Sequence, residues 1–414
     1  MEQIKLPKQF KPERGVFDGP FGPWVKNALA ASKDVTADML VPTESDLKLI
    51  SKLAFNVDEL GTRMAEAIMA KGPLGGQLNK GLEQGLGSLE DPPEVLREFL
   101  AYYEDLPEWS YKKELEDYLS NEPESSVAKP PLVTFLGDGY AMAVGFFVGA
   151  NYPAVGQSLV ATGSVARGAS RMVESLKWVD ATRDLRNFVP HGSAITTSAK
   201  VRVAHGFARK MIERSGQWDK EYLGEIISDF DNMIFLSGLT LVEDRLPNLS
   251  QSELNALRLE NKAIHYLLGA PKELVTMSAQ ESKRFFMMAI AHLDDSPGTA
   301  RQVVKNFQDN EYFRPTDTWR QKLSREGAFI TANLLTRINW GDEMADNIGL
   351  QRKIYGLPMD SIASFIKDPP APVKRLQPFA RKAGKYAIKL AAKKAKYRAG
   401  SDDKSTYSGS YGAF

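Results

Sequence analysis

Few residues of this chain could bind a metal, because it has four histidines and no cysteine among its 414 residues. Without cysteine it cannot form disulfides, cysteine-based zinc sites, iron–sulfur clusters, thiolate-ligated haem or covalently attached c-type haem. His205 has the most informative setting, since it follows Val201 by four residues within an apolar pattern of helical period. A histidine there is either a core residue or a neutral imidazole ligand, and the spacing alone favours the core residue.

Two expected helices, joined by a polar turn, would position such groups within residues 164–216. Ser164 is a suitable N-cap for the first helix. Its apolar stripe consists of Ala169, Met172, Val173, Leu176 and Val179. A second stripe beside it consists of Arg171, Glu174, Ser175 and Trp178. The turn covers residues 187–197 and contains Pro190 and Gly192. The second helix has a predicted buried stripe of Val201, Ala204, His205, Ala208, Met211 and Ile212. We therefore expect His205 to face the core.

Three segments, in order, resemble one family of proteins. The run KVRVAHGFAR, preceded by RMVES, resembles the haem-binding signature of the latex clearing protein (rubber oxygenase) family and of the related oxygenases of the mycophenolic acid pathway. LPEWSYKKEL at residues 106–115 and AIHYLLGAPKELVTMSAQES at residues 263–282 resemble segments before and after that signature. The resemblance covers roughly residues 100–340. It implies an all-α fold with a globin-like core around a haem b cofactor (heme b).

The resemblance also implies roles for individual residues. In the family, the histidine of the KVRxxH segment is the proximal ligand of the haem iron, which corresponds to His205. The family's rubber oxygenases carry an Arg-x-x-Lys-Thr pattern on the preceding helix; here Arg171 is kept, Glu174 replaces the lysine and Ser175 the threonine. These three residues are the expected catalytic groups. An apolar pocket would raise the pKa of Glu174 and suit it to proton transfer, whereas the alternative is a surface ion pair with Arg171 worth about 0.3 kcal/mol.

Three more residues are expected near the cofactor. Lys200 and Arg202 flank His205 on other faces of its helix and would meet either the haem propionates or solvent, and Ser237 is a further expected contact. The resemblance implies that an apolar, isoprenoid-like or other unsaturated substrate reacts with O₂ by cleavage of a carbon–carbon double bond. Because glutamate replaces the family's lysine, a monooxygenase or peroxygenase activity remains an alternative. The alternative of another class is a haem-binding or lipid-binding helical protein without catalysis.

Charge is unevenly distributed along the chain. Residues 369–414 hold 11 Lys and Arg against 2 Asp, so their net charge is +9 and that of residues 1–368 is −8. No basic stripe is evident in the acidic part, which argues against nucleic acid as a partner. Between Lys374 and Arg398, basic residues surround an alanine-rich apolar face, which predicts a basic amphipathic helix. Such a helix either contacts anionic membranes peripherally or folds back on the acidic body.

The rest of the chain reads as one large helical domain. We expect an N-terminal arm (residues 1–42) that packs by Phe17, Phe21 and Trp24 or binds a partner, an all-α haem oxygenase-like domain with extra N-terminal helices (43–368) and the basic tail (369–414). The N-terminus has no secretory signal pattern, so a cytoplasmic location is expected. Helices are predicted after a capping box at Thr43 and, beyond His205, over residues 220–230, 231–242, 250–268, 278–291, 297–310 and 320–335.

Three segments allow competing interpretations. The glycine-spaced residues 72–89 lack the lysine of a phosphate-binding loop, which favours a flexible lid or turn. Residues 139–166 have no charge, but five glycines and several polar residues favour two short buried helices, broken near Tyr152-Pro153, over a membrane span. For His292-x-Asp294-Asp295, capping of a helix end is favoured over metal binding.

Overall fold

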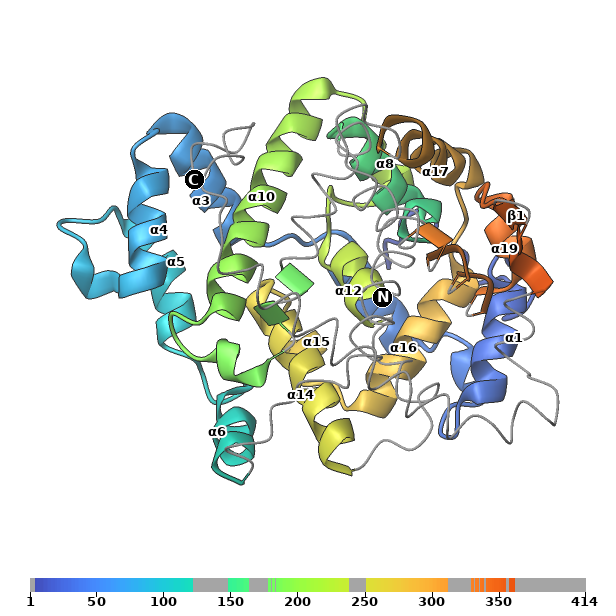
Figure 1. Ribbon diagram of the computed structural model, residues 1–414, viewed down its shortest axis with the longest axis horizontal. Coiled ribbons are helices and arrows are strands. Elements are labelled where there is room, and N and C mark those ends of the chain that lie inside the picture. Colours follow the sequence, from blue (N-terminus) through green and yellow to red (C-terminus); the bar gives the residue numbers. More distant parts are fainter. Residues whose placement is uncertain are drawn as a thin grey trace.

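The computed structural model describes residues 4–121, 148–163, 178–179, 181–182, 184–237, 251–311, 329–330, 332–334, 336–338, 340–354 and 357–361. Their regular structure is almost entirely helical (Figure 1). Within them, the one sheet is an antiparallel pair of two-residue strands, β1 (Lys353–Ile354) and β2 (Leu357–Pro358). The predicted all-α class is therefore confirmed. The basic tail lies outside the described residues.

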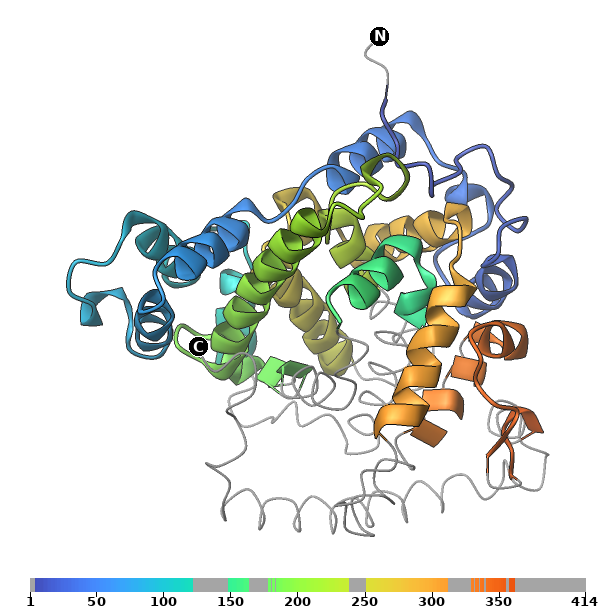
Figure 2. The same ribbon diagram turned by 90° about the horizontal axis from the view of Figure 1, so that it is seen from above.

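The longer helices, in chain order, are α1 (Gly22–Ala31), α2 (Glu44–Ala54), α3 (Glu59–Ala70), α4 (Leu74–Gln84), α5 (Glu94–Glu104), α6 (Lys112–Asn121), α8 (Pro153–Ala161), α10 (Ser193–Ser215), α12 (Asp229–Ser237), α14 (Gln251–Leu267), α16 (Ala279–His292) and α17 (Pro297–Glu311). Shorter helices are η1 (Asp38–Leu40), η2 (Leu86–Ser88), η4 (Gly149–Asn151), η5 (Leu185–Phe188), α11 (Lys220–Leu223), α15 (Lys272–Val275) and α19 (Asp342–Asn347). The long helix α10 runs diagonally across the molecule, between α3 to α5 on one side and α12 and α14 on the other (Figures 1 and 2).

Several helix ends follow from local sequence signals. The side chain of Thr43 accepts a hydrogen bond from the backbone of Asp46, and Asp46 accepts one from the backbone of Thr43, so the predicted capping box is confirmed. An equivalent pair, Ser278 and Glu281, begins α16. Gly269 ends α14 with a φ of 80°, a conformation that favours glycine.

The second half of α16 is buried on all sides. Residues 285–291 are each at most 1% exposed. Trp24 of α1 packs edge-on against Phe286 and stacks on Trp340, with the two indole centroids 4.4 Å apart. The N-terminal arm thus enters the core through Phe21 and Trp24, as expected, whereas Phe17 remains 37% exposed.

The expectation of a flexible lid or turn over residues 72–89 is wrong. Most of this segment is the helix α4, followed by η2, because Leu74, Leu78 and Leu82 recur every four residues and are buried. Gly81 permits close packing, since a Cβ there would lie 2.4 Å from a methyl carbon of Leu100 in α5. Glycine content suggested flexibility, but the apolar period decided the structure.

The predicted helix over residues 220–230 is also wrong, because it is divided in two. α11 ends at Leu223, where Gly224 takes a φ of 84°. A Cβ at Gly224 would lie 2.5 Å from the carbonyl oxygen of Ala54, so α2 occupies the space a side chain would need. α12 then begins after a reciprocal pair of hydrogen bonds between Ser228 and Asp231.

Two further predictions concern uncharged and acidic segments. The predicted break near Tyr152-Pro153 is confirmed, since η4 ends there and α8 begins at Pro153. Among the described residues, no helix combines the length and the apolar character that a membrane span requires. At the end of α16, the Asp294 carboxylate binds Arg14 at 2.5 Å and Tyr222 at 3.1 Å, so it links distant segments instead of capping a helix.

Candidate functional site

α10 presents its most buried side to α3. Gly206 makes the closest approach, because a Cβ there would lie 2.6 Å from the Gly61 carbonyl oxygen and 2.8 Å from Ala65 Cβ. The buried residues of α10 are Ala194, Ile195, Ser198, Ala199, Arg202, Val203, Gly206, Arg209 and Ile212. The close approach of the two helices therefore requires glycine at position 206.

His205 lies on the flank of α10 beside this buried side. Of the six residues in the predicted buried stripe, only Ile212 is fully buried; Met211 is 54% exposed, and Val201, Ala204, His205 and Ala208 are half-buried. The prediction that His205 faces the core is therefore wrong in detail. The interior face instead carries Arg202 and Arg209, which an apolar pattern assigns to solvent.

Arg202 forms a buried ion pair with Asp58, the N-cap of α3. Its Nη2 and Nε lie 2.7 and 2.8 Å from the two carboxylate oxygens, and its Nη1 donates to the Tyr103 hydroxyl at 3.2 Å. Burial alone would raise the pKa of Asp58, but the charge and hydrogen bonds of Arg202 outweigh it and hold that pKa below its ordinary value. Neither alternative expected for Arg202 describes it: it is 2% exposed, and its donors serve Asp58 and Tyr103.

Arg209, one helical turn beyond His205, binds the same end of α3. It donates to the Asp58 carbonyl oxygen at 3.3 Å, to Thr62 Oγ1 at 2.9 Å and to the carbonyl oxygens of Ile226 and Ile227. Two acids at the start of α12 lie near this cluster. Burial raises the pKa of Asp229 to about 6 and that of Asp231 to about 7, although Arg209 and hydrogen bonds oppose the change.

The remaining predicted site residues are only partly described. Lys200 is exposed on α10, which is compatible with both of its expected environments. Ser237 is the last residue of α12, and its side chain lies outside the described set. Arg171, Glu174 and Ser175 also lie outside the described residues.

Trp178, which follows the predicted catalytic residues in the sequence, contacts α10. Its indole nitrogen donates to Ser198 Oγ at 2.9 Å, and its side chain is half-buried. Ser198 precedes His205 by seven residues, so two helical turns, or about 10 Å, separate them on one side of α10. In the sequence, Glu174 is four residues before Trp178.

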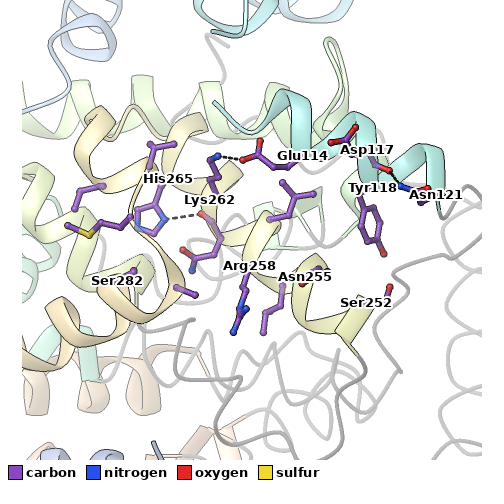
Figure 3. A pocket seen from close by; sticks show the side chains of 17 residues that line it. Glu114, Asp117, Tyr118, Asn121, Ser252, Asn255, Arg258, Lys262, His265 and Ser282 are labelled. Atoms are coloured by element: carbon purple, nitrogen blue, oxygen red, sulfur yellow. Dashed lines mark hydrogen bonds and ion pairs between the residues drawn. The ribbon is translucent and has the colours of Figure 1, made fainter. Parts of the chain in front are cut away.

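Sequence reasoning missed a groove between α6 and α14. Its volume is about 560 Å³, and Glu114 of α6 meets Lys262 of α14 at its rim (Figure 3). Its apolar part includes Leu259, Leu274, Val275 and Met277. His265 also lines it; the imidazole is buried beside the Asn261 carbonyl, 2.9 Å from Nδ1, and burial lowers its pKa to about 4. Periodicity could not find this groove because α6 and α14 are far apart in the sequence.

The four histidines differ in their suitability as a ligand of a haem iron. His191 approaches the Leu82 carbonyl oxygen at 3.2 Å, and the buried His292 approaches the Met288 carbonyl oxygen at 2.8 Å. His205 is set on a flank formed by Val201, Ala204 and Ala208, whose small apolar side chains would allow a flat macrocycle to approach the helix. The described residues contain no group of three or more acids or histidines able to hold a metal ion. A haem, which needs one protein ligand, is compatible with this donor set.

The described residues form an all-α fold, and His205 lies on the half-buried flank of α10, the longest helix among them. The fold is similar to that of "Latex Clearing Protein LCP in the closed state", with a TM-score of 0.51 and 17% sequence identity over 80% of this chain and 90% of that chain. The sequence matches no protein-family model and no curated protein. The resemblance inferred from the motifs is thus confirmed at the level of the fold.

Proposed function

We propose that this chain is a haem-b-dependent oxygenase acting with O₂ on an apolar, unsaturated substrate. The observation that carries the proposal is the setting of His205: a half-buried histidine among small apolar residues on α10, within a fold similar to that of latex clearing protein. A bound haem would supply an iron able to activate O₂. A neutral imidazole at His205 would hold the iron, and the half-buried flank would help to keep water from it.

The groups proposed to take part in the oxygen chemistry are Arg171, Glu174 and Ser175. Support comes from the hydrogen bond between Trp178 and Ser198, which anchors the chain just beyond these residues on the same side of α10 as His205. In a pocket with little water, the Glu174 carboxyl would bind or release a proton as oxygen chemistry requires. Arg171 would stabilise negative charge near the Glu174 carboxyl.

Replacing His205 with alanine tests the ligand assignment. After expression with added haem, the wild-type chain should be red-brown with a Soret band that sharpens on reduction, and His205→Ala should lose stoichiometric haem while its helical circular dichroism is kept. His265→Gln is the control, because it removes an imidazole that is not expected to bind the iron and should retain haem. A colourless wild-type protein would refute the proposal, and full haem in His205→Ala would refute the assignment of this histidine.

Replacing Glu174 with glutamine tests the catalytic proposal separately. The substitution keeps the size and removes the titrating charge, so it should retain haem but change substrate turnover or the pH dependence of the ferric spectrum. The substrate is identified beforehand by mass spectrometry of apolar molecules that copurify with the protein. Haem without any oxygen-dependent change in those molecules would favour a non-catalytic haem-binding protein.

A further inference from the structure

His205 lies between two buried arginines that hold the same end of one neighbouring helix. Arg202 precedes it by three residues and binds the Asp58 carboxylate; Arg209 follows it by four and binds the Asp58 carbonyl oxygen and Thr62. Both arginines are 2% exposed. These contacts span the helical turns on both sides of His205.

The geometry of a helix turns these contacts into a constraint on the imidazole. At about 100° per residue, Arg202 and Arg209 lie on one line along α10, roughly 40 to 60° around the axis from His205. Fixing both side chains to α3 fixes the rotation of α10 about its axis at the histidine. Gly206 fixes the separation, because its backbone approaches the Gly61 carbonyl too closely for any side chain between them.

Aromatic residues make the Arg202 end of this arrangement rigid. The guanidinium carbon lies 4.3 Å from the ring centroid of Tyr102 and 5.4 Å from that of Phe99, both in α5. Tyr102 stacks on Tyr266 of α14 at 4.7 Å, and each hydroxyl donates to the backbone carbonyl of the other residue. The arginine therefore has one arrangement available, held by α3, α5 and α14 together.

We infer that Arg202, Asp58 and Arg209 form a positioning clamp that sets the orientation of the His205 imidazole toward the haem iron. This inference rests on the proposed function and assigns the clamp residues no contact with the haem or the substrate. Because the clamp acts by fixing the rotation of α10, a positive charge alone at positions 202 and 209 is not sufficient to orient the imidazole. The forked, multiple hydrogen bonds of arginine are required, and lysine cannot reproduce them.

The test compares Arg202→Lys and Arg209→Lys with Arg337→Lys in the haem-loaded full chain. Arg337 is the matched control: it is also buried, it bonds Asp342, Asp346, Asn333 and the Leu350 carbonyl, and it lies near α19, on the side of the molecule away from α10 (Figure 1). All three variants keep the charge and lose the fork. Thermal unfolding of each measures the general cost of that loss.

The readouts are the iron–imidazole stretching band of the ferrous protein, by resonance Raman spectroscopy, and the rate of haem transfer to apomyoglobin. Arg202→Lys and Arg209→Lys should shift the band and speed haem loss about tenfold, in the range known for residues that orient a metal-bound histidine. Arg337→Lys should change neither, at a similar loss of thermal stability.

Two outcomes would overturn the inference while leaving the proposed function in place. One is an unchanged band in both clamp variants; the other is an equal shift in the Arg337 variant, which would mark a general effect of destabilisation. Two clamp variants are used so that a folding failure in one leaves the other to decide. A wild-type chain that takes up no haem would refute the proposed function, and the clamp's assigned role with it.

Discussion

Replacing Asp231 with asparagine should make the protein more stable at neutral pH and leave it little changed in acid. Asp231 follows Ser228 at the start of α12 and accepts a hydrogen bond from its backbone nitrogen at 2.9 Å. An asparagine carbonyl oxygen can accept the same bond, so the variant removes the charge and keeps the cap. The effect on stability then comes from the titration of one buried carboxyl group.

The magnitude and the sign both follow from the pKa. Burial raises the pKa of Asp231 from 3.8 to about 7 in the folded chain, and a change of that size corresponds to roughly 4 kcal/mol. The folded state therefore binds this proton more tightly than the unfolded state does. Its contribution to stability is fully present below about pH 4 and is lost as the pH rises through about 7. The stability of Asp231→Asn relative to wild type should thus rise across this interval.

Asp46→Asn provides a control of opposite sign. Asp46 occupies the same capping position in α2, but the hydrogen bonds of Arg284 and Thr43 outweigh burial and lower its pKa. Its stabilisation is present above about pH 4 and lost in acid, so this variant should be destabilised at pH 7. Urea unfolding of both variants and wild type at several values between pH 4 and 8 gives the comparison. A difference between Asp231→Asn and wild type that stays flat across that range would refute the reasoning.

Two further predictions concern packing. Gly206→Ala should destabilise the fold by about 2 kcal/mol in thermal unfolding, because the new methyl group meets the Gly61 backbone. Gly76→Ala in α4, which has open space around it, should instead stabilise the fold by about 1 kcal/mol. Equal effects of the two substitutions would contradict the close helix crossing. Leu78→Ala should cost about 3 kcal/mol, since Leu78 is fully buried. A cost near zero would restore the view of this segment as a mobile lid.

The sequence was sufficient for the fold class and for many helix ends. Thr43, Pro153, Gly269 and Ser278 act through local hydrogen bonds or fixed dihedral angles, so their effects can be predicted from a few neighbouring residues. Gly224 could not be interpreted in this way. It ends α11 where the backbone of Ala54, distant in sequence, occupies the space beside it.

The candidate site was predicted less accurately than the fold, for an electrostatic reason. The apolar period of α10 pointed to Val201, Ala204 and Ala208 as the interior, because arginine was assigned to solvent. Arg202 is buried only because Asp58 compensates its charge from another helix, and that pairing cannot be inferred from either segment alone. The apolar pattern placed His205 in the core, whereas it is half-buried beside the buried side of α10; its role as a haem ligand stays a prediction.

The pairing of Trp24 with Trp340 has a consequence for biosynthesis. The first helix completes its core contacts with α16 and with a tryptophan about 300 residues later in the chain. At the usual 5 to 20 residues per second, the ribosome needs roughly 15 to 60 s to supply those partners. During that interval the face of Trp24 that stacks on Trp340 stays exposed on the nascent chain, and exposed apolar surface of this kind makes a partly folded chain prone to aggregation.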